Sequence, residues 1–110
     1  MQKQKILFVC SQNKWRSLTA EKIFENHEEY TVKSAGTAKG ARIKITAGLI
    51  GWADIIMVME KKHRSRIQEK FADLLTDKTL FVLNIPDDYQ FMDEALIEIL
   101  MARVGEIITI

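Results

Sequence analysis

Short apolar runs alternate along the chain with stretches whose apolar residues recur at helical spacing. Four runs predict β-strands: Ile6 to Cys10, Tyr30 to Ser34, Asp54 to Met59 and Thr79 to Asn84. Helices are predicted over residues 17–29, 46–51, 61–75 and 93–108. In this scheme Ser17 and Thr46 are the N-caps of the first two helices. Strands joined by helix-length crossovers predict an α/β fold, a parallel sheet with helices on both faces.

The length and charge narrow the functional classes. A chain of 110 residues is expected to form a single domain over 1–110, and 47% hydrophobic with 28% charged residues is ordinary for a soluble protein. The net charge of +1 favours neither a nucleic-acid nor a membrane partner. The run from Ile6 to Val9 is too short for a signal or membrane segment. The densest basic stretch, residues 61–66, is interpreted as a solvated helix face.

The single cysteine, Cys10, excludes an intrachain disulfide and argues against a cysteine-based metal site. A free thiol lasts best in a reducing compartment, which favours the cytoplasm. His27 and His63 have no partner at metal-ligand spacing, so both are predicted to lie on the surface. We therefore expect no metal and no cofactor.

Cys10 ends the first strand, and an Arg-Ser pair follows six positions later, where a helix begins. A loop between a strand and a helix aims backbone N–H groups at an anion. A thiolate at one side and the guanidinium of Arg16 at the other are the groups that phosphoryl transfer through cysteine requires. The alternatives are that Cys10 is a small buried hydrophobic residue and that Arg16 forms a surface ion pair.

Two further residues of this segment have candidate roles. Ser17 could donate its hydroxyl to the sulfur when the sulfur leaves, although capping the helix would explain it alone. Asn13 suits a loop position with unusual backbone angles, and we interpret it as an organiser of the loop.

The segment from Cys10 to Glu21, C-S-Q-N-K-W-R-S-L-T-A-E, resembles the phosphate loop of the low-molecular-weight protein tyrosine phosphatases, usually C-x-G-N-x-C-R-S-P-x-A-E. Further blocks resemble the family in the same order: Ser34-Ala35-Gly36-Thr37, residues 41–46, residues 52–60, and Ile85-Pro86-Asp87-Asp88-Tyr89. The resemblance implies a three-layer sandwich with a four-stranded parallel sheet in the order 2-1-3-4. The phosphate loop would connect the first strand to the first helix.

The resemblance also implies an activity and its residues. The chain would be a cysteine-dependent phosphomonoester hydrolase that acts on phosphotyrosine proteins or small aryl phosphates through a phosphocysteine. Asp87 would be the general acid, with a turn aspartate as the alternative. The catalytic residues are then predicted to be Cys10, Arg16, Asp87 and Ser17. The phosphate-binding loop is predicted to comprise Ser11, Gln12, Asn13, Lys14 and Trp15.

The chain departs from the family pattern at several positions. Gln12 replaces a glycine, Leu18 a proline and Asp88 the proline after the acid; Trp15 stands where many members have a second cysteine. Only four residues separate Thr37 from Arg42, where typical members have a longer segment that shapes the substrate pocket. We therefore expect the catalytic residues to be present and that wall of the pocket to be missing.

Four residues near the predicted site have open roles. Asp88 could help to keep the neighbouring acid protonated by like-charge repulsion. Tyr89 and Trp15 could form apolar walls for an aromatic substrate, although Tyr89 could equally pack on the core. Arg42 is interpreted as a helix-start residue rather than a second anion contact.

Two other functional classes stay open. One is a phosphoryl carrier similar to the cysteine-phosphorylated IIB components of sugar transport systems, which have no need of a general acid such as Asp87. The other is a catalytically weak module that binds phosphate or phosphopeptides. Arsenate reductases of similar fold need further cysteines, and this chain has none. The sequence leaves the oligomeric state open.

Overall fold

A computed structural model describes residues 3–108 of the chain. Its strands are β1 (Gln4–Cys10), β2 (Tyr30–Gly36), β3 (Ile55–Val58) and β4 (Thr79–Val82). Its helices are α1 (Arg16–Phe24), α2 (Ala47–Trp52), α3 (Lys61–Phe71), a 3₁₀ turn (Ala72–Leu74) and α4 (Glu94–Gly105). The predicted alternation of strands and helices is confirmed.

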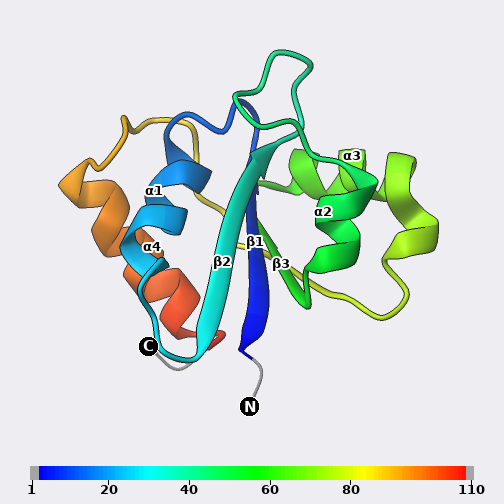
Figure 1. Ribbon diagram of the computed structural model, residues 1–110. Helices are drawn as coiled ribbons and strands as arrows, with labels where there is room; N and C mark the ends of the chain where they lie inside the picture. Colours follow the sequence, from blue (N-terminus) through cyan, green and yellow to red (C-terminus); the bar gives the residue numbers. More distant parts are fainter. Residues whose placement is uncertain (1–2, 109–110) are drawn as a thin grey trace.

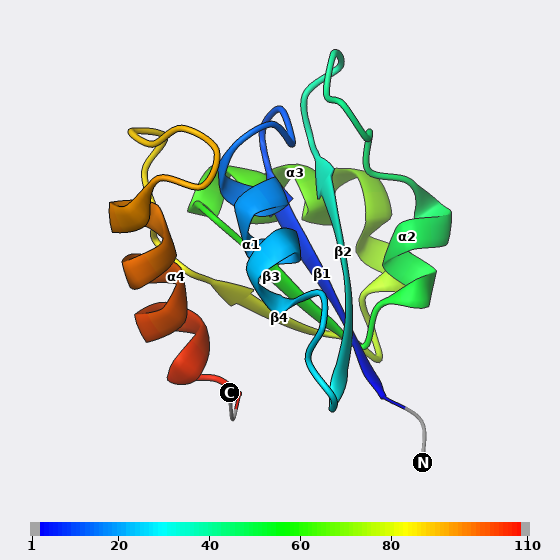
Figure 2. The ribbon, with the colours of Figure 1, turned by 60° about the vertical axis from the view of Figure 1, so that its left-hand side comes forward.

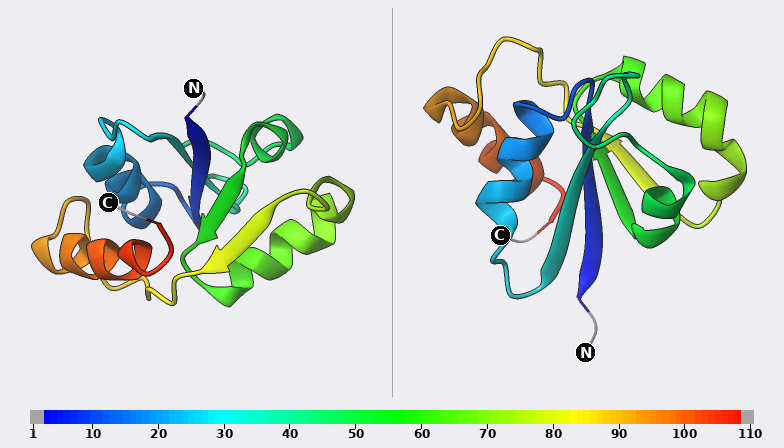
Figure 3. Two further views of the ribbon diagram at one scale, coloured as in Figure 1. Left: turned by 90° about the horizontal axis from the view of Figure 1, so that it is seen from below. Right: turned by 45° about the horizontal axis from the view of Figure 1, so that its top comes forward.

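The strands form one parallel sheet in the order β2-β1-β3-β4, as predicted. Helices α1 and α4 cover one face, and α2 and α3 cover the other (Figures 1 and 2). Seen from below and from the tilted view of Figure 3, the sheet separates these two pairs of helices. The chain leaves β1 toward β2 on one side and later places β3 on the other, so the strand order reverses at the carboxyl end of β1. That is the usual ligand site of open parallel sheets.

The protein has one apolar core on each face of the sheet, and alternate residues of β1 point into the two cores. Ile6 and Phe8 pack under α1 and α4, while Leu7 and Val9 pack under α2 and α3. All four are fully buried, because neighbouring strands flank β1 on both edges and helices cover both of its faces. The central strand thus fixes the position of Cys10 at its end.

The first helix differs from the prediction at both ends. α1 begins at Arg16 and ends at Phe24, so it contains Ser17 and stops five residues short of Glu29. The N-cap of α1 is Trp15, whose side chain makes no capping hydrogen bond, and the assignment of Ser17 as N-cap was wrong. The apolar pattern beyond Phe24 is too weak to continue the helix, since the next residues are Glu25 and Asn26.

The remaining helices follow the pattern more closely. The hydroxyl of Thr46 accepts a hydrogen bond from the backbone N–H of Leu49, which confirms it as the N-cap of α2. The third helical stretch ends as an α-helix at Phe71 and continues only as the 3₁₀ turn. α4 begins at Glu94, because Asp93 is its N-cap and accepts a hydrogen bond from the backbone N–H of Ala95. At its other end it stops at Gly105, before the predicted end at Ile108.

The strand ends shift by one or two residues. β2 continues past Ser34 to Gly36, which pairs with Cys10 across the sheet. β3 and β4 are shorter than predicted at their ends. Asn84 has a left-handed φ of 57°, which ends the regular pairing of β4 and turns the chain toward the site.

Candidate active site

Three segments meet at the carboxyl edge of the sheet: the loop after β1, the segment after β2 and the segment after β4 (Figure 1). The loop over residues 11–15 connects Cys10 to the first residue of α1, Arg16. Asn13 holds its central turn with a left-handed φ of 58°. Asparagine tolerates this region better than most residues, so the role predicted for Asn13 as loop organiser fits its conformation.

Gly36 makes room for this loop. A Cβ atom at this position would lie 2.4 Å from the carbonyl oxygen of Ser11 and 3.0 Å from the backbone nitrogen of Asn13. The first distance is far inside van der Waals contact, so only glycine lets β2 approach the loop this closely. The glycine of the Ser34-Ala35-Gly36-Thr37 block is therefore required in this chain by the close approach of the loop.

Two polar groups lie within hydrogen-bonding distance of the sulfur of Cys10. The backbone N–H of Asn13 donates to Sγ over 3.3 Å, and the hydroxyl of Ser17 lies 3.0 Å from Sγ. Cys10 is 3% exposed, yet it lines a cavity open to the surface. The nucleophilic sulfur would therefore face the cavity with two polar groups beside it.

Ser17 lies inside the first turn of α1, where its hydroxyl serves the loop instead of capping the helix. It accepts a hydrogen bond from the side-chain amide of Asn13 over 2.7 Å. Its own proton then has two acceptors within reach, the sulfur of Cys10 and, at 3.3 Å, the carbonyl oxygen of Ala35. This geometry suits the donation to sulfur that the sequence suggested.

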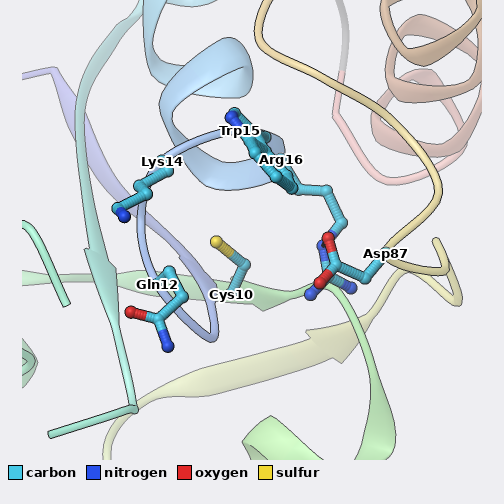
Figure 4. Close-up of a pocket in the computed structure, with 6 residues that line it drawn as sticks. All are labelled: Cys10, Gln12, Lys14, Trp15, Arg16 and Asp87. Atoms are coloured by element: carbon cyan, nitrogen blue, oxygen red, sulfur yellow. Dashed lines mark ion pairs between the residues drawn. The ribbon is translucent and has the colours of Figure 1, made fainter. Parts of the chain in front are cut away.

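Arg16 is 1% exposed, so the alternative of a surface ion pair is wrong. Its Nη1 donates to Oε1 of Glu60 over 2.5 Å and to the carbonyl oxygen of Ile85 over 2.9 Å. Its Nε lies 3.6 Å from Oδ1 of Asp87. The guanidinium is thus anchored on one edge and faces the cavity with Cys10 (Figure 4).

The cavity has a volume of about 140 Å³. Six side chains line it: Cys10, Gln12, Lys14, Trp15, Arg16 and Asp87 (Figure 4). Asp87 comes from the segment after β4 and is 51% exposed, so it is open to both the cavity and water. The structure therefore brings the predicted nucleophile, arginine and acid to one place.

Two of the residues with open roles lie elsewhere. Tyr89 is half-buried and packs against the apolar core under α1 and α4, so it does not line the cavity, and core packing is the correct alternative. Asp88 is exposed and is not among the lining residues either. Trp15 does line the cavity and is 43% exposed, so it is the aromatic wall that the structure supplies.

Two residues of the site were missed in the sequence. Glu60 follows β3 and holds Arg16, and His63, predicted to lie on the surface, is fully buried. The side chains of both form a reciprocal capping box at the start of α3. The sequence does contain a pattern that could have identified them. An E-x-x-H spacing follows the apolar run of β3, and β3 lies next to β1 in the sheet.

The charges of these two residues are set by their surroundings. Partial burial raises the pKa of Glu60, but the hydrogen bond and charge of Arg16, together with Lys62 and His63, outweigh it and hold the pKa below 4.5. Burial lowers the pKa of His63 from 6.5 to about 4, and the charges of Arg16, Lys62 and Arg66 act in the same direction against that of Glu60. At neutral pH, Glu60 is an anion and His63 is uncharged.

Arg42 is neither a helix-start residue nor part of the cavity lining. Its backbone N–H donates to the carbonyl oxygen of Gln12 over 2.9 Å, and its Nε donates to that of Asn13 over 3.1 Å. The N–H groups of Thr37 and Ala38 donate to the carbonyl oxygens of Cys10 and Ser11. The short segment after β2 therefore braces the phosphate loop from behind.

Residues 5–51 match the family model described as low molecular weight phosphotyrosine protein phosphatase. The resemblance to this phosphatase family is confirmed. No curated protein sequence matches the chain. The matched residues include Cys10 and the loop that follows it.

Three solved structures illustrate the shared fold. The YwlE arginine phosphatase of Geobacillus stearothermophilus has 22% identity and a TM-score of 0.70 over 94% of this chain and 91% of its own. Vibrio vulnificus Wzb in complex with benzylphosphonate has 23% identity and a TM-score of 0.75 over 96% and 97%. The tyrosine phosphatase Wzb from Escherichia coli K30, in complex with phosphate, has 20% identity and a TM-score of 0.75 over 96% of both chains.

The departures from the family's phosphate loop cost no backbone strain at two positions. Gln12 replaces a glycine, but the left-handed residue of the loop is Asn13, so position 12 does not require glycine. Leu18 replaces a proline within the first turn of α1. The backbone N–H of a residue in this turn makes no helical hydrogen bond, so a leucine and a proline both fit there. Neither substitution therefore requires a change in the backbone of the loop or of α1.

Within residues 3–108, no group of three or more His, Cys, Asp or Glu side chains is arranged to hold a metal ion. Over the same described residues, no helix has the length and apolar character needed to cross a bilayer.

Proposed function

We propose that this chain hydrolyses phosphomonoesters by transferring the phosphoryl group to Cys10 and then to water. The observation that carries the proposal is that the sulfur of Cys10, the guanidinium of Arg16 and the carboxyl group of Asp87 line one cavity of about 140 Å³. A nucleophile, a cation for the transferred group and an acid for the leaving group are the three parts that this chemistry needs.

The anchoring of Arg16 decides how it would hold a phosphoryl group. Both hydrogens of Nη1 are directed at oxygens of Glu60 and Ile85. The opposite edge, Nε and Nη2, is then the planar fork that would accept two phosphoryl oxygens. The N–H groups of the loop, among them that of Asn13, would bind the remaining charge.

The first step forms a sulfur–phosphorus bond and breaks the bond from phosphorus to the ester oxygen. Asp87, in its protonated form, would donate its proton to that leaving oxygen, so an alcohol departs. In the second step the Asp87 carboxylate would take a proton from water, whose oxygen attacks phosphorus. The sulfur then leaves as a thiolate, and the hydroxyl of Ser17, 3.0 Å away, would stabilise the charge.

The substrate class that fits the site is an aryl phosphate, such as phosphotyrosine in a protein. Trp15 offers an exposed indole at the rim of the cavity, against which an aromatic leaving group can pack. Tyr89 does not contribute to this wall, since it packs on the core. We propose the cytoplasm as the location, since Cys10 must stay reduced.

Hydrolysis of para-nitrophenyl phosphate in the presence of EDTA tests the proposal. We expect the wild type to release phosphate and Cys10→Ser to be inactive, because serine is a much weaker nucleophile in this setting. Acceptance of a phosphoryl group from a protein donor without turnover of the ester would favour the carrier. Tight phosphopeptide binding without turnover would favour the binding module. Either result would contradict hydrolase activity.

A further inference from the structure

We propose that His63 is a positioning residue of the phosphate loop, which acts through Ser11 and Glu60 without touching the substrate. This inference rests on the proposed function, because it concerns the cradle in which the phosphoryl group would be bound. His63 is the third residue of α3, a helix whose residues are otherwise mainly exposed, and its side chain is fully buried. A buried imidazole in such a helix needs a reason, and its two hydrogen bonds supply one.

The two ring nitrogens of His63 have fixed and opposite roles. Nδ1 accepts a hydrogen bond from the backbone N–H of Glu60 over 3.0 Å. A backbone N–H can only donate, so Nδ1 carries no proton, and the proton of the neutral ring is on Nε2. Nε2 therefore donates to the hydroxyl oxygen of Ser11, which lies 2.9 Å away.

The uncharged state keeps this arrangement in place. Arg16, Lys62 and Arg66 are the cations that face His63, and Glu60 is the facing anion. A second proton on the ring would have to sit on Nδ1, directly against the N–H of Glu60, and would break the capping hydrogen bond. His63 thus has a single tautomer with one acceptor and one donor.

The hydrogen bonds of His63 link both sides of the cavity. Ser11 is the residue that follows the nucleophile, and its carbonyl oxygen is held from the other side by the N–H of Ala38 over 2.9 Å. Glu60, the residue whose N–H is bound by Nδ1, anchors Nη1 of Arg16. One imidazole therefore fixes the start of the phosphate loop relative to the carboxylate that holds the guanidinium.

Two substitutions separate the two nitrogens. His63→Asn keeps an acceptor near the position of Nδ1 and is too short to reach Ser11. His63→Gln places a donor near the position of Nε2 and loses the capping acceptor. We expect His63→Asn to lower kcat/KM about tenfold and to weaken vanadate binding by a similar factor, because one hydrogen bond to the cradle is lost. In His63→Gln we expect only part of kcat/KM to be restored, because the donor to Ser11 is kept while the hydrogen bond from the N–H of Glu60 is lost.

The leaving group distinguishes a loop effect from an effect on the acid. A displaced cradle weakens the hold on the phosphoryl group itself, so the loss in His63→Asn should be equal for para-nitrophenyl and phenyl phosphate. Ser11→Ala should show a similar loss, and the double variant should lose no more than either single variant. Wild-type kinetics and vanadate affinity in His63→Asn, or additive losses in the double variant, would overturn the proposal.

A measurement on the wild type covers the case in which these variants do not fold. Long-range ¹H–¹⁵N NMR spectra report which imidazole nitrogen carries the proton. We expect His63 to show the Nε2–H tautomer at neutral pH, with slow exchange of that proton, and vanadate to perturb its signal. The Nδ1–H tautomer, or no response to vanadate that binds, would contradict the proposal. Absence of ester turnover with an intact response would instead count against the proposed function alone.

Discussion

Nε of Arg16 and Oδ1 of Asp87 lie 3.6 Å apart across the mouth of the cavity. The two residues come from opposite parts of the chain, the start of α1 and the segment after β4. Their contact is at the edge of Arg16 that a phosphoryl group would use. In the proposed reaction, a bound phosphoryl group would replace Asp87 as the partner of this edge, and its ester oxygen would lie next to the carboxyl group.

This relationship predicts how the loss of the acid will depend on the substrate. Asp87→Asn should reduce kcat/KM, which reports the first step alone, by about 10²–10⁴ for phenyl phosphate, whose leaving oxygen needs a proton. The loss should be much smaller for para-nitrophenyl phosphate, whose leaving group departs as an anion. Asp88→Asn is the matched control, because Asp88 does not line the cavity. If Asp88→Asn were the slower variant, the assignment of the acid would be wrong.

Substitution of the guanidinium should be severe even when the charge is kept. Arg16→Lys supplies one point charge where Arg16 contacts Glu60, Ile85 and Asp87 from two edges. We expect kcat/KM to fall by roughly 10²–10³, since the planar fork for the phosphoryl oxygens is lost. Steady-state kinetics on a protein shown by circular dichroism to be folded check this. Near-normal kcat/KM would mean that Arg16 serves only the packing of Glu60.

The contact between β2 and the phosphate loop predicts a steric effect. In Gly36→Ala the new Cβ would lie 2.4 Å from the carbonyl oxygen of Ser11, so the loop must move. We expect a loss of about 1–3 kcal/mol in the free energy of unfolding and weaker vanadate binding. Gly40→Ala is the control, since a Cβ there meets nothing within 4 Å. Equal urea midpoints for the two variants would contradict this prediction.

The buried imidazole predicts the stability of the protein in weak acid. The pKa of His63 is about 4 in the folded protein and 6.5 in an exposed ring. Between these values the unfolded chain binds a proton that the folded chain excludes, so the free energy of unfolding falls as the pH is lowered. The contribution of the uncharged His63 to the free energy of unfolding is fully present above pH 6.5. Roughly 2 kcal/mol of this free energy should be lost between pH 7 and pH 5.

Urea unfolding at pH 7 and pH 5 measures this loss, with His63→Gln as the control that cannot titrate. Glu60 does not contribute to this change, because its pKa is held below 4.5. The variant should show a flatter profile than the wild type. Parallel profiles would mean that His63 is protonated in the folded protein at these pH values.

The elements of the fold were predictable because they depend on local patterns. The unbroken apolar run of β1 and the helical repeat of α4 identify a central strand and a covering helix from the sequence alone. The end of α1 could not be predicted from the sequence. Residues 25–29 carry helix-forming glutamates without an apolar face, and only packing decides where such a helix stops.

The residues of the site likewise fall into those that the sequence predicts and those that depend on the folded structure. That Cys10, Arg16 and Asp87 lie at one cavity could be predicted because their spacing and order match a known motif. Of the two roles predicted for Ser17, the helix cap was wrong, because a serine at a predicted helix start looks the same whether it caps the helix or binds the loop. The other role, donation to the sulfur of Cys10, stays a prediction that their 3.0 Å separation supports. Glu60 and His63 depend on which strands are neighbours in the sheet, and the burial of His63 follows from a contact 52 residues away in sequence.

The phosphocysteine is tested most directly by quenching the protein in acid during turnover of a phosphate ester and measuring the mass of its peptides. Asp87→Asn suits this experiment, because hydrolysis of the intermediate needs the carboxylate as a base. We predict that the peptide with Cys10 gains one phosphoryl group and that Cys10→Ala gains none. A phosphoryl group on another residue, or turnover by Cys10→Ala, would contradict the account.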